Sequence, residues 1–300
     1  MKKPMKILAE GLGHPEGPYP LPDGRVVFAN TYLSEIGVWD PNLGKGRYAF
    51  TGGGPNACML GSDGFVYCTN TPTAGKWVAP EKRPPCIQRA SRDGKVEIVA
   101  TSADGVQLNA PNDLTFGPDG NLYFTDSGDW DPETKPHPGY ICMITPDGAA
   151  HLLEELEPVY PNGIVAEPDG SIIWVESYTR RIIRRRPDGT KALLATLAEN
   201  HVPDGLKIDE KGNLWITSFS SGGIDILSRD GAFIDFLETG GVPLNCVFSG
   251  STLFVCDFGT TVLDTNTPMG GRLLSIDAGV TGMPLYKGRI KLRESLAAGE

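Results

Sequence analysis

Residues 111–126 read PNDLTFGPDGNLYFTD: a proline with polar residues, an apolar run, a Pro-Asp-Gly turn and a second apolar run. Two short runs rich in aromatic and β-branched residues around an Asp-Gly turn predict a β-hairpin. The pattern occurs four more times, and the residue after the proline always lies eight positions before the turn glycine. These hairpins begin at Pro15, Pro55, Pro161 and Pro203, and a sixth, shorter copy begins at Pro243.

The spacing of the hairpins indicates the architecture. Successive prolines lie 40, 56, 50, 42 and 40 residues apart. A repeat of about 40–50 residues with four strands is typical of a β-propeller blade. Two further strand-like runs follow each hairpin, as at residues 140–144 and 151–153. We therefore predict an all-β fold, a six-bladed β-propeller with four antiparallel strands per blade, forming a single domain over residues 1–300.

The two ends of the chain must complete the last blade. Residues 271–276 predict its third strand, and the fourth comes either from residues 6–9 or from residues 284–286. We favour the N-terminal segment, because it would tie the two ends of the chain together. The connections at residues 71–86 and 127–139 are long for a compact repeat, and such loops usually carry function.

Composition limits the partners that we expect. A net charge of -10 argues against a nucleic-acid partner and against binding to an anionic membrane. The basic run RRIIRRR at residues 180–186 alternates like a strand, so we interpret it as a solvated strand face. The apolar run at residues 7–9 is too short for a signal-peptide core, and no run approaches the roughly 20 apolar residues of a membrane span. We expect a cytoplasmic protein, monomeric or a small homo-oligomer.

The six cysteines show no paired metal-ligand spacing, so we expect reduced thiols. Cys58 and Cys68 are placed to face each other across one hairpin, and Cys246 and Cys256 across another.

Polar residues follow the key prolines. In a propeller the first strand of each blade lines the central channel, so these residues should ring one mouth of it. They are Glu16, Asn56, Asn112, Asn162 and Asp204, with Leu244 in the sixth blade. Turn chemistry accounts for Asn and Asp in these places but poorly for Glu16. Two carboxylates and several amide oxygens form a hard-oxygen set suited to Ca²⁺, Mg²⁺ or Mn²⁺, and a cation would relieve the repulsion between the carboxylates.

The segments HPEGP, PNDLTFGPDGNLYFTD, PNGIVAEPDGSIIWVES and VPDGLKIDEKGNLWITS resemble the senescence-marker-protein/gluconolactonase/luciferin-regenerating-enzyme family over essentially the whole chain. The resemblance implies a six-bladed propeller that binds one divalent cation and commonly hydrolyses lactones. It implies Glu16, Asn162 and Asp204 as metal ligands and Asp204 as general base. Asn112 matches a position that contacts substrate in the lactonases and metal in related organophosphate hydrolases.

Two other residues are candidates for substrate binding. Asp126 begins a loop on the same face, and Trp130 lies within that long loop.

One departure from the family pattern concerns the residue that contacts a sugar substrate. Ala110 stands where sugar lactonases often have an arginine, which puts an aldonolactone substrate in doubt without affecting the metal site. Among cations Ca²⁺ is favoured, and Mg²⁺, Mn²⁺, Zn²⁺ and Fe²⁺ stay open.

The sequence thus predicts a metal-dependent hydrolase of a lactone or similar small ester. In this hypothesis the cation polarises the carbonyl and Asp204 accepts a proton from the attacking water. The chain has no Gly-x-Ser-x-Gly nucleophile elbow. The alternatives are a phosphotriester hydrolase with the same oxygen ligands and a non-catalytic binding propeller with a structural ion. His14 and His201 are either proton shuttles or loop residues.

Overall fold

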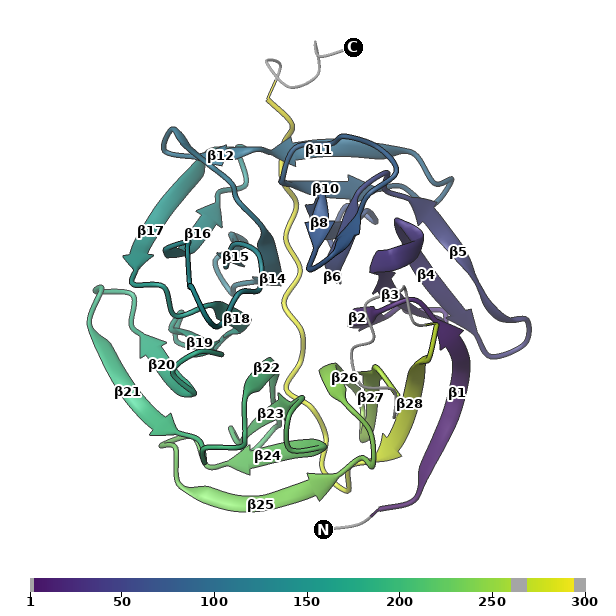
Figure 1. The fold of residues 1–300 in the computed structure, drawn as a ribbon, viewed down its shortest axis with the longest axis vertical. Helices are drawn as coiled ribbons and strands as arrows, with labels where there is room; N and C mark the ends of the chain where they lie inside the picture. Colours follow the sequence, from purple (N-terminus) through teal and green to yellow (C-terminus); the bar gives the residue numbers. More distant parts are fainter. Residues whose placement is uncertain (1–2, 260–268, 294–300) are drawn as a thin grey trace.

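The computed structural model describes residues 3–259 and 269–293. The strands of this part of the chain form six four-stranded antiparallel sheets that radiate from a central axis (Figure 1). The predicted six-bladed β-propeller is therefore confirmed. Within the described ranges no helix has the length and apolar character needed to cross a membrane.

The blades follow the order of the chain, each running from the axis outwards. Blade 1 contains β2 (Pro15–Pro20), β3 (Val26–Asn30), β4 (Glu35–Asp40) and β5 (Gly44–Phe50). Blade 2 contains β6 (Gly54–Leu60), β7 (Val66–Thr71), β10 (Cys86–Ala90) and β11 (Val96–Ala100). Blade 3 contains β14 (Pro111–Phe116), β15 (Leu122–Asp126), β16 (Gly139–Ile144) and β17 (Ala150–Leu156).

The second half of the ring repeats this plan. Blade 4 contains β18 (Pro161–Ala166), β19 (Ile172–Glu176), β20 (Arg181–Arg185) and β21 (Lys191–Thr196). Blade 5 contains β22 (Pro203–Ile208), β23 (Leu214–Ser218), β24 (Gly223–Leu227) and β25 (Phe233–Glu238). Blade 6 contains β26 (Pro243–Ser249), β27 (Thr252–Asp257), β28 (Gly271–Asp277) and β1 (Met5–Leu12).

Short elements occupy some connections. They are the 3₁₀ turn η1 (Thr31–Leu33) and the hairpins of β8 (Thr73–Ala74) with β9 (Trp77–Val78) and of β12 (Ser102–Ala103) with β13 (Val106–Gln107).

Local chemistry explains the inner hairpins. In the hairpin of β14 and β15, Gly120 takes a φ of +81°, which a side chain would strain, and its N–H donates to the carbonyl of Gly117 at 3.0 Å. The turn residue Asp119 accepts a hydrogen bond from the Tyr123 hydroxyl at 2.6 Å. Asp63 and Tyr67 repeat this contact in blade 2 at 2.8 Å. The Asp-Gly turn therefore sets both the reversal and the register of the second strand.

The N-terminal strand closes the ring. β1 pairs with β28 in antiparallel register from Met5↔Ile276 to Leu12↔Gly271, so the prediction that favoured the N-terminal segment is confirmed. The rival segment, residues 284–286, is not part of a strand.

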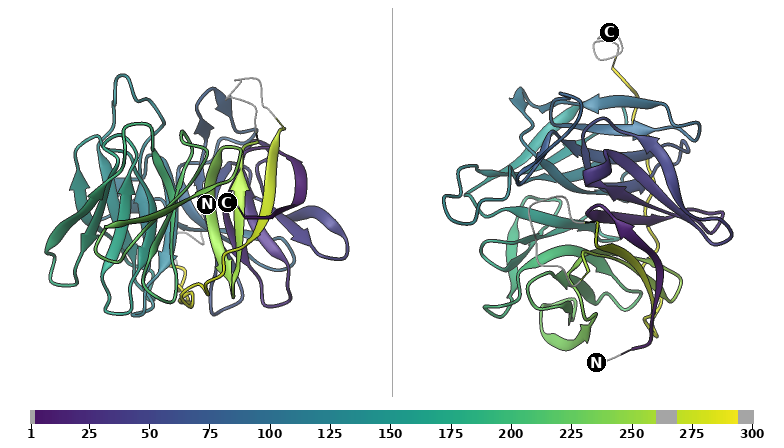
Figure 2. Two further views of the ribbon diagram at one scale, coloured as in Figure 1. Left: turned by 90° about the horizontal axis from the view of Figure 1, so that it is seen from below. Right: turned by 45° about the vertical axis from the view of Figure 1, so that its right-hand side comes forward.

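The C-terminal residues 278–293, here the C-terminal strap, cross the lower face of the disc (Figures 1 and 2). Backbone hydrogen bonds tie the strap to blades 2, 3, 5 and 6, the last through Gly282 N–H, which donates to Gly250 at 3.0 Å. Met283 N–H donates to Ile208 in blade 5 at 2.9 Å, Ser62 N–H in blade 2 donates to Gly288 at 2.7 Å, and Lys291 N–H donates to Pro146 in blade 3 at 2.9 Å.

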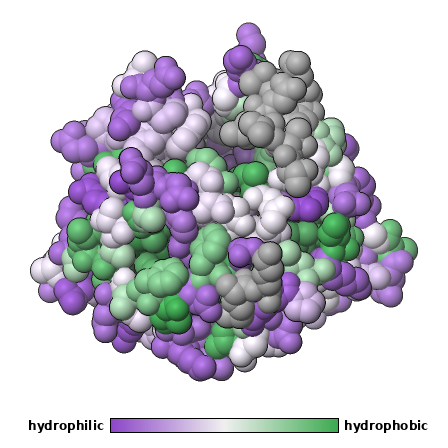
Figure 3. Space-filling view, turned by 60° about the horizontal axis from the view of Figure 1, so that its bottom comes forward, coloured by the Kyte–Doolittle hydropathy of each residue, from purple (hydrophilic) through white to green (hydrophobic). Residues whose placement is uncertain are grey.

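The long connections after β7 and β15 rise from the opposite, upper face (Figure 2). The strap therefore closes the lower end of the channel and leaves the upper mouth to the loops. Hydrophilic residues cover most of the rim in Figure 3, and apolar residues there occur in separate patches.

Two predictions made from sequence periodicity were wrong in detail. Cys58 does lie opposite Cys68, but Cys246 lies opposite Val255 rather than Cys256, and all six cysteines are buried free thiols. The basic run is also not a uniformly solvated face, because Arg184 is buried and forms an ion pair with the buried Glu167. A one-residue difference in register changes which side chains meet across a hairpin.

Docking of the strap can be tested at Ile290, which is 2% exposed and donates its N–H to the Tyr67 hydroxyl at 2.9 Å. Ile290→Ala should lower the free energy of unfolding by about 2–5 kcal/mol, because it removes buried methyl groups and leaves a cavity. Chemical denaturation measures this. The control Leu43→Ala changes a side chain that is 86% exposed and should have little effect. Equal small effects for both variants would show that the strap is not packed against the blades.

Candidate metal centre and active site

Six equivalent positions meet at the upper mouth of the channel. Each inner strand begins with a proline or reaches one at its second residue, and the inner strands contact their neighbours in a closed circuit, β2–β6–β14–β18–β22–β26–β2. The residues after the prolines, here the upper ring, are Glu16, Asn56, Asn112, Asn162, Asp204 and Leu244. All but the half-buried Asn56 are buried. The structure therefore brings the sequence-predicted set to one place.

Threonines in the second strands fix the upper ring. Thr125 accepts a hydrogen bond from Asp113 N–H at 3.1 Å in its own blade and donates to the Asn162 carbonyl of the next blade at 2.9 Å. Thr69 repeats the arrangement with Ala57 and Asn112, at 3.0 and 2.8 Å. Each such hydroxyl hydrogen-bonds the inner strand of its own blade and that of the next blade, so these bonds link the ring positions of neighbouring blades.

Burial perturbs the two carboxylates of the upper ring. Burial raises the pKa of Asp204 to about 8, the charge of Asp113 adds to that rise, and a hydrogen bond from Asn162 opposes it. Burial also raises the pKa of Glu16 well above its ordinary value, and the charges of Asp204 and Asp113 act in the same direction. The charges of carboxylates from blades 1, 3 and 5 thus act on one another at this mouth of the channel.

Asn162 presents an unsatisfied acceptor to this site. Its Nδ2 donates to the Ser177 hydroxyl at 3.2 Å, whereas its buried Oδ1 has no hydrogen-bond partner among the described residues. Glu16 uses Oε2 to accept from Gly17 N–H at 2.7 Å. Buried oxygens without donors are unusual, and a cation is one partner that satisfies them.

A second layer lies directly below the upper ring. It consists of the next residue of each inner strand, which is Gly17, Ala57, Asp113, Gly163, Gly205 or Asn245. A Cβ on Gly163 would lie 2.5 Å from the carbonyl oxygen of Asp204, and one on Gly205 would lie 2.4 Å from Asn245 Oδ1. Glycine is therefore required where the inner strands approach most closely, which explains why it follows Asn162 and Asp204.

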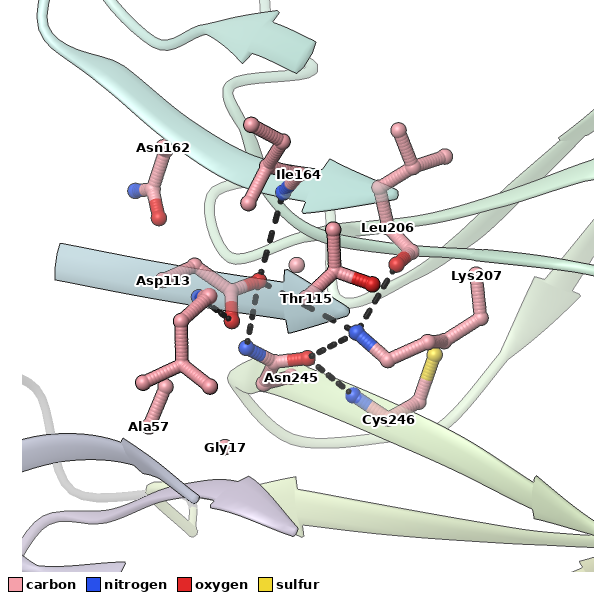
Figure 4. A network of polar contacts seen from close by, with 12 residues as sticks. Gly17, Ala57, Asp113, Thr115, Asn162, Ile164, Leu206, Lys207, Asn245 and Cys246 are labelled. Carbon is pink, nitrogen blue, oxygen red and sulfur yellow. Dashed lines mark hydrogen bonds and ion pairs between the residues drawn. The ribbon is translucent and has the colours of Figure 1, made fainter. Parts of the chain in front are cut away.

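Asp113, Asn245 and Lys207 form a polar network in this layer (Figure 4). Asp113 accepts from Leu114 N–H at 2.7 Å and from Asn245 Nδ2 at 3.4 Å. The Lys207 ammonium lies 3.9 Å from Asp113 Oδ2 and donates to the Leu206 carbonyl at 2.9 Å. All three side chains are buried. Beneath the network a cavity of about 20 Å³ separates Thr115 and Lys207 from Leu285 of the strap.

Sequence reasoning missed these three residues. Asp113 and Asn245 occupy the position that is glycine or alanine in the other blades, so the repeat register carried a signal that a channel-facing side chain stands there. Lys207 carried no such signal. Strand periodicity places it on the same face as Gly205, but the sequence does not show that its ammonium meets Asp113 of another blade.

The remaining sequence candidates take different places. Asn112 accepts from Asn56 Nδ2 at 3.1 Å and so stays within the upper ring. Asp126 is 1% exposed, and its two carboxylate oxygens accept from the N–H groups of Asn109 and Ala110 at 2.8 and 2.6 Å. It therefore holds the segment that precedes Asn112, and a contact with substrate stays a prediction.

The two histidines differ. His201 Nδ1 lies 2.9 Å from both carboxylate oxygens of Asp225 in β24, so His201 anchors its loop to an outer strand. His14 packs between Tyr32 and Phe258, with centroid distances of 5.2 and 5.1 Å, and burial lowers its pKa to about 4. The lowered pKa favours the neutral form of His14, which stands two residues before Glu16 in the chain.

The described residues contain no group of three or more His, Cys, Asp or Glu side chains arranged to hold a metal ion. The candidate set at the upper ring is of another kind, two carboxylates with an asparagine oxygen. Such a set suits a hard cation that completes its coordination with water or substrate. Glu16, Asn162 and Asp204 fit a divalent cation on this ground, and their role as ligands stays a prediction.

Residues 14–256 match the family described as the SMP-30/Gluconolactonase/LRE-like region. The chain belongs to this family. It is 26% identical over 292 residues to a gluconolactonase of Zymomonas mobilis subsp. mobilis, a match that covers 84% of this chain and 78% of that protein. Family membership supports hydrolysis of a lactone.

Solved structures share the fold. A luciferin-regenerating enzyme superposes with a TM-score of 0.79 at 19% identity, covering 96% of this chain and 100% of that one. Regucalcin from Agrobacterium tumefaciens, a calcium-binding protein, superposes with a TM-score of 0.76 at 19% identity, covering 97% and 99%.

The raised pKa of Asp204 predicts how stability depends on pH in the absence of a cation. A carboxyl whose pKa rises from 3.8 to about 8 on folding binds more protons in the folded state, so its contribution is complete below about pH 4 and is lost as the pH rises toward 8. In excess EDTA the Tm should therefore fall between about pH 5 and pH 8. Ca²⁺ should restore it at the upper end.

Asp204→Asn is the matched control, because it removes the titrating group and keeps the shape. Its Tm in EDTA should depend less on pH than that of the wild type. Parallel pH profiles for the two proteins would contradict the assignment of this titration to Asp204.

Proposed function

We propose that this protein is a divalent-metal-dependent lactonase whose cation is held by Glu16, Asn162 and Asp204. The observation that carries the proposal is the charge at the channel mouth. When Glu16, Asp113 and Asp204 are ionised and Lys207 is protonated, their formal charges sum to −3 + 1 = −2. One divalent cation neutralises that sum. Without the cation, burial and mutual repulsion favour the protonated carboxyls of Glu16 and Asp204, as their raised pKa values indicate.

Oxygen ligands favour Ca²⁺ or another hard cation over a thiolate-seeking one. The calcium-binding regucalcin on the same fold adds support for Ca²⁺. When bound, the cation supplies Lewis-acid polarisation of a carbonyl oxygen.

The chain itself supplies the remaining parts. Asp204 accepts the proton of the water that attacks the lactone carbonyl carbon. The bond from that carbon to the ring oxygen then breaks, and the ring oxygen takes up a proton, so the product is a hydroxy acid. Asn112 lies beside the cation ligands in the upper ring and is placed to orient the substrate. The Asp113–Lys207–Asn245 network holds the floor of the site in place.

Hydrolysis of aldonolactones and of simple γ- and δ-lactones, followed with a pH indicator, tests the proposal. Activity should require Ca²⁺ or another divalent cation and disappear in EDTA. Asp204→Asn should lower kcat by about 100-fold or more, because it removes the general base. The control Asp188→Asn, in an exposed turn of blade 4, should keep wild-type activity.

Three outcomes would contradict the proposal. Full activity in EDTA would exclude a catalytic cation, and full activity of Asp204→Asn would exclude the proposed base. Turnover of organophosphates with no turnover of any lactone would indicate a phosphotriester hydrolase instead. No turnover of either class with any divalent cation would favour a non-catalytic propeller.

A further inference from the structure

Two groups of aromatic side chains flank the upper ring. The first, the Trp130 cluster, joins Trp130 to Tyr160, Tyr178 and Phe219 at centroid distances of 4.8, 5.0 and 5.6 Å. The second, the Tyr32 cluster, joins Tyr32 to His14, Trp77 and Phe258 at 5.2, 5.9 and 6.3 Å. Each cluster draws on the long loops, through Trp130 in one and Trp77 in the other.

Each cluster also includes the residue that stands two positions before a candidate metal ligand. Tyr160 immediately precedes Pro161 and Asn162. Burial raises the pKa of Tyr160, and the charge of Asp204 adds to the rise. His14 stands in the equivalent position before Pro15 and Glu16. Its buried Nδ1 has no hydrogen-bond partner among the described residues.

The two clusters lie across the channel from each other. His14 precedes β2 of blade 1 and Tyr160 precedes β18 of blade 4, which are three places apart in the circuit of six inner strands. Figure 1 shows β2 and β18 on opposite sides of the central axis. The oxygen ligands therefore lie between the clusters.

The backbone at these two positions is strained. His14 has a φ of +59° and Tyr160 a φ of +54°, both in the left-handed region that non-glycine residues seldom adopt. The equivalent residues before the other four prolines do not share this conformation. Strained backbone concentrates at functional sites. Here the two strained residues, His14 and Tyr160, carry aromatic side chains and stand two positions before the candidate ligands Glu16 and Asn162.

Most members of the two clusters are not core residues. Tyr32, Trp77, Trp130, Tyr160, Tyr178 and Phe219 are all partly exposed, whereas Phe258, which backs the Tyr32 cluster, is 1% exposed, like Trp174 between the blades. Partly exposed aromatic rings beside a polar centre give a bound molecule flat apolar surfaces to pack against. A polyhydroxylated sugar would instead need hydrogen-bond partners for each buried hydroxyl.

We propose that the substrate is a lactone with an aromatic or other flat apolar substituent, whose ester group lies at the cation ligands while the substituent packs against the Trp130 and Tyr32 clusters. This inference rests on the proposed function, and it names the substrate class of the same site.

Paired substrates test the inference. Isochroman-3-one and δ-valerolactone share a six-membered lactone with an alkoxide leaving group and differ in the fused benzene ring. For each lactone, kcat/KM is divided by the rate constant of its hydroxide-catalysed hydrolysis, which corrects for intrinsic reactivity. This normalised kcat/KM should be about tenfold or more higher for isochroman-3-one than for δ-valerolactone. Trp130→Leu should reduce this preference toward one. The matched control Trp39→Leu, in β4, should retain the wild-type ratio.

A binding measurement separates this inference from the proposed hydrolysis. The ketones 2-tetralone and cyclohexanone lack the scissile bond, and calorimetry in Ca²⁺ should show about tenfold tighter binding of 2-tetralone, lost in Trp130→Leu. That result would uphold the aromatic recognition even if no lactone were hydrolysed. Equal binding of the two ketones, or hydrolysis of glucono-1,5-lactone in preference to isochroman-3-one, would overturn it while leaving lactonase activity intact.

Discussion

Acidic side chains buried around one point on the propeller axis are the constraint on which the rest of this structure depends. Glu16, Asp204 and Asp113 come from three blades and sit within reach of one another's charge. Lys207 offsets one of the three. A fold that only needed a stable channel would place apolar side chains there, as it does with Leu244 in blade 6. A divalent cation would favour the ionised forms of these carboxyls, so their clustering at one point supports the proposed oxygen-ligated cation site.

The surrounding architecture keeps that charge in place. Glycines of the second layer let the inner strands approach, and threonine hydroxyls such as that of Thr125 join each strand to the next. The strap closes the lower end of the channel, so the upper mouth is the side where the loops and aromatic clusters gather. The contacts that hold neighbouring inner strands together therefore also fix the positions of the upper-ring side chains, one from each blade.

Much of this could be predicted from the sequence, because the signals are local and repeated. Five turn glycines, four of them preceded by Asp, predicted five hairpins, their spacing indicated the number of blades, and the prolines located the upper ring. What escaped prediction depends on long-range register. Three pairs form only once the neighbouring strand or blade is in place. They are Cys246 with Val255, Arg184 with Glu167, and Lys207 with Asp113.

The central claim is that one divalent cation sits among Glu16, Asn162 and Asp204. Anomalous diffraction from crystals soaked in Mn²⁺ tests it most directly. We predict a single strong peak on the channel axis, about 2–2.6 Å from a carboxylate oxygen of Glu16, from Asn162 Oδ1 and from a carboxylate oxygen of Asp204. A map with no peak there, or with the ion bound only elsewhere on the molecule, would contradict it.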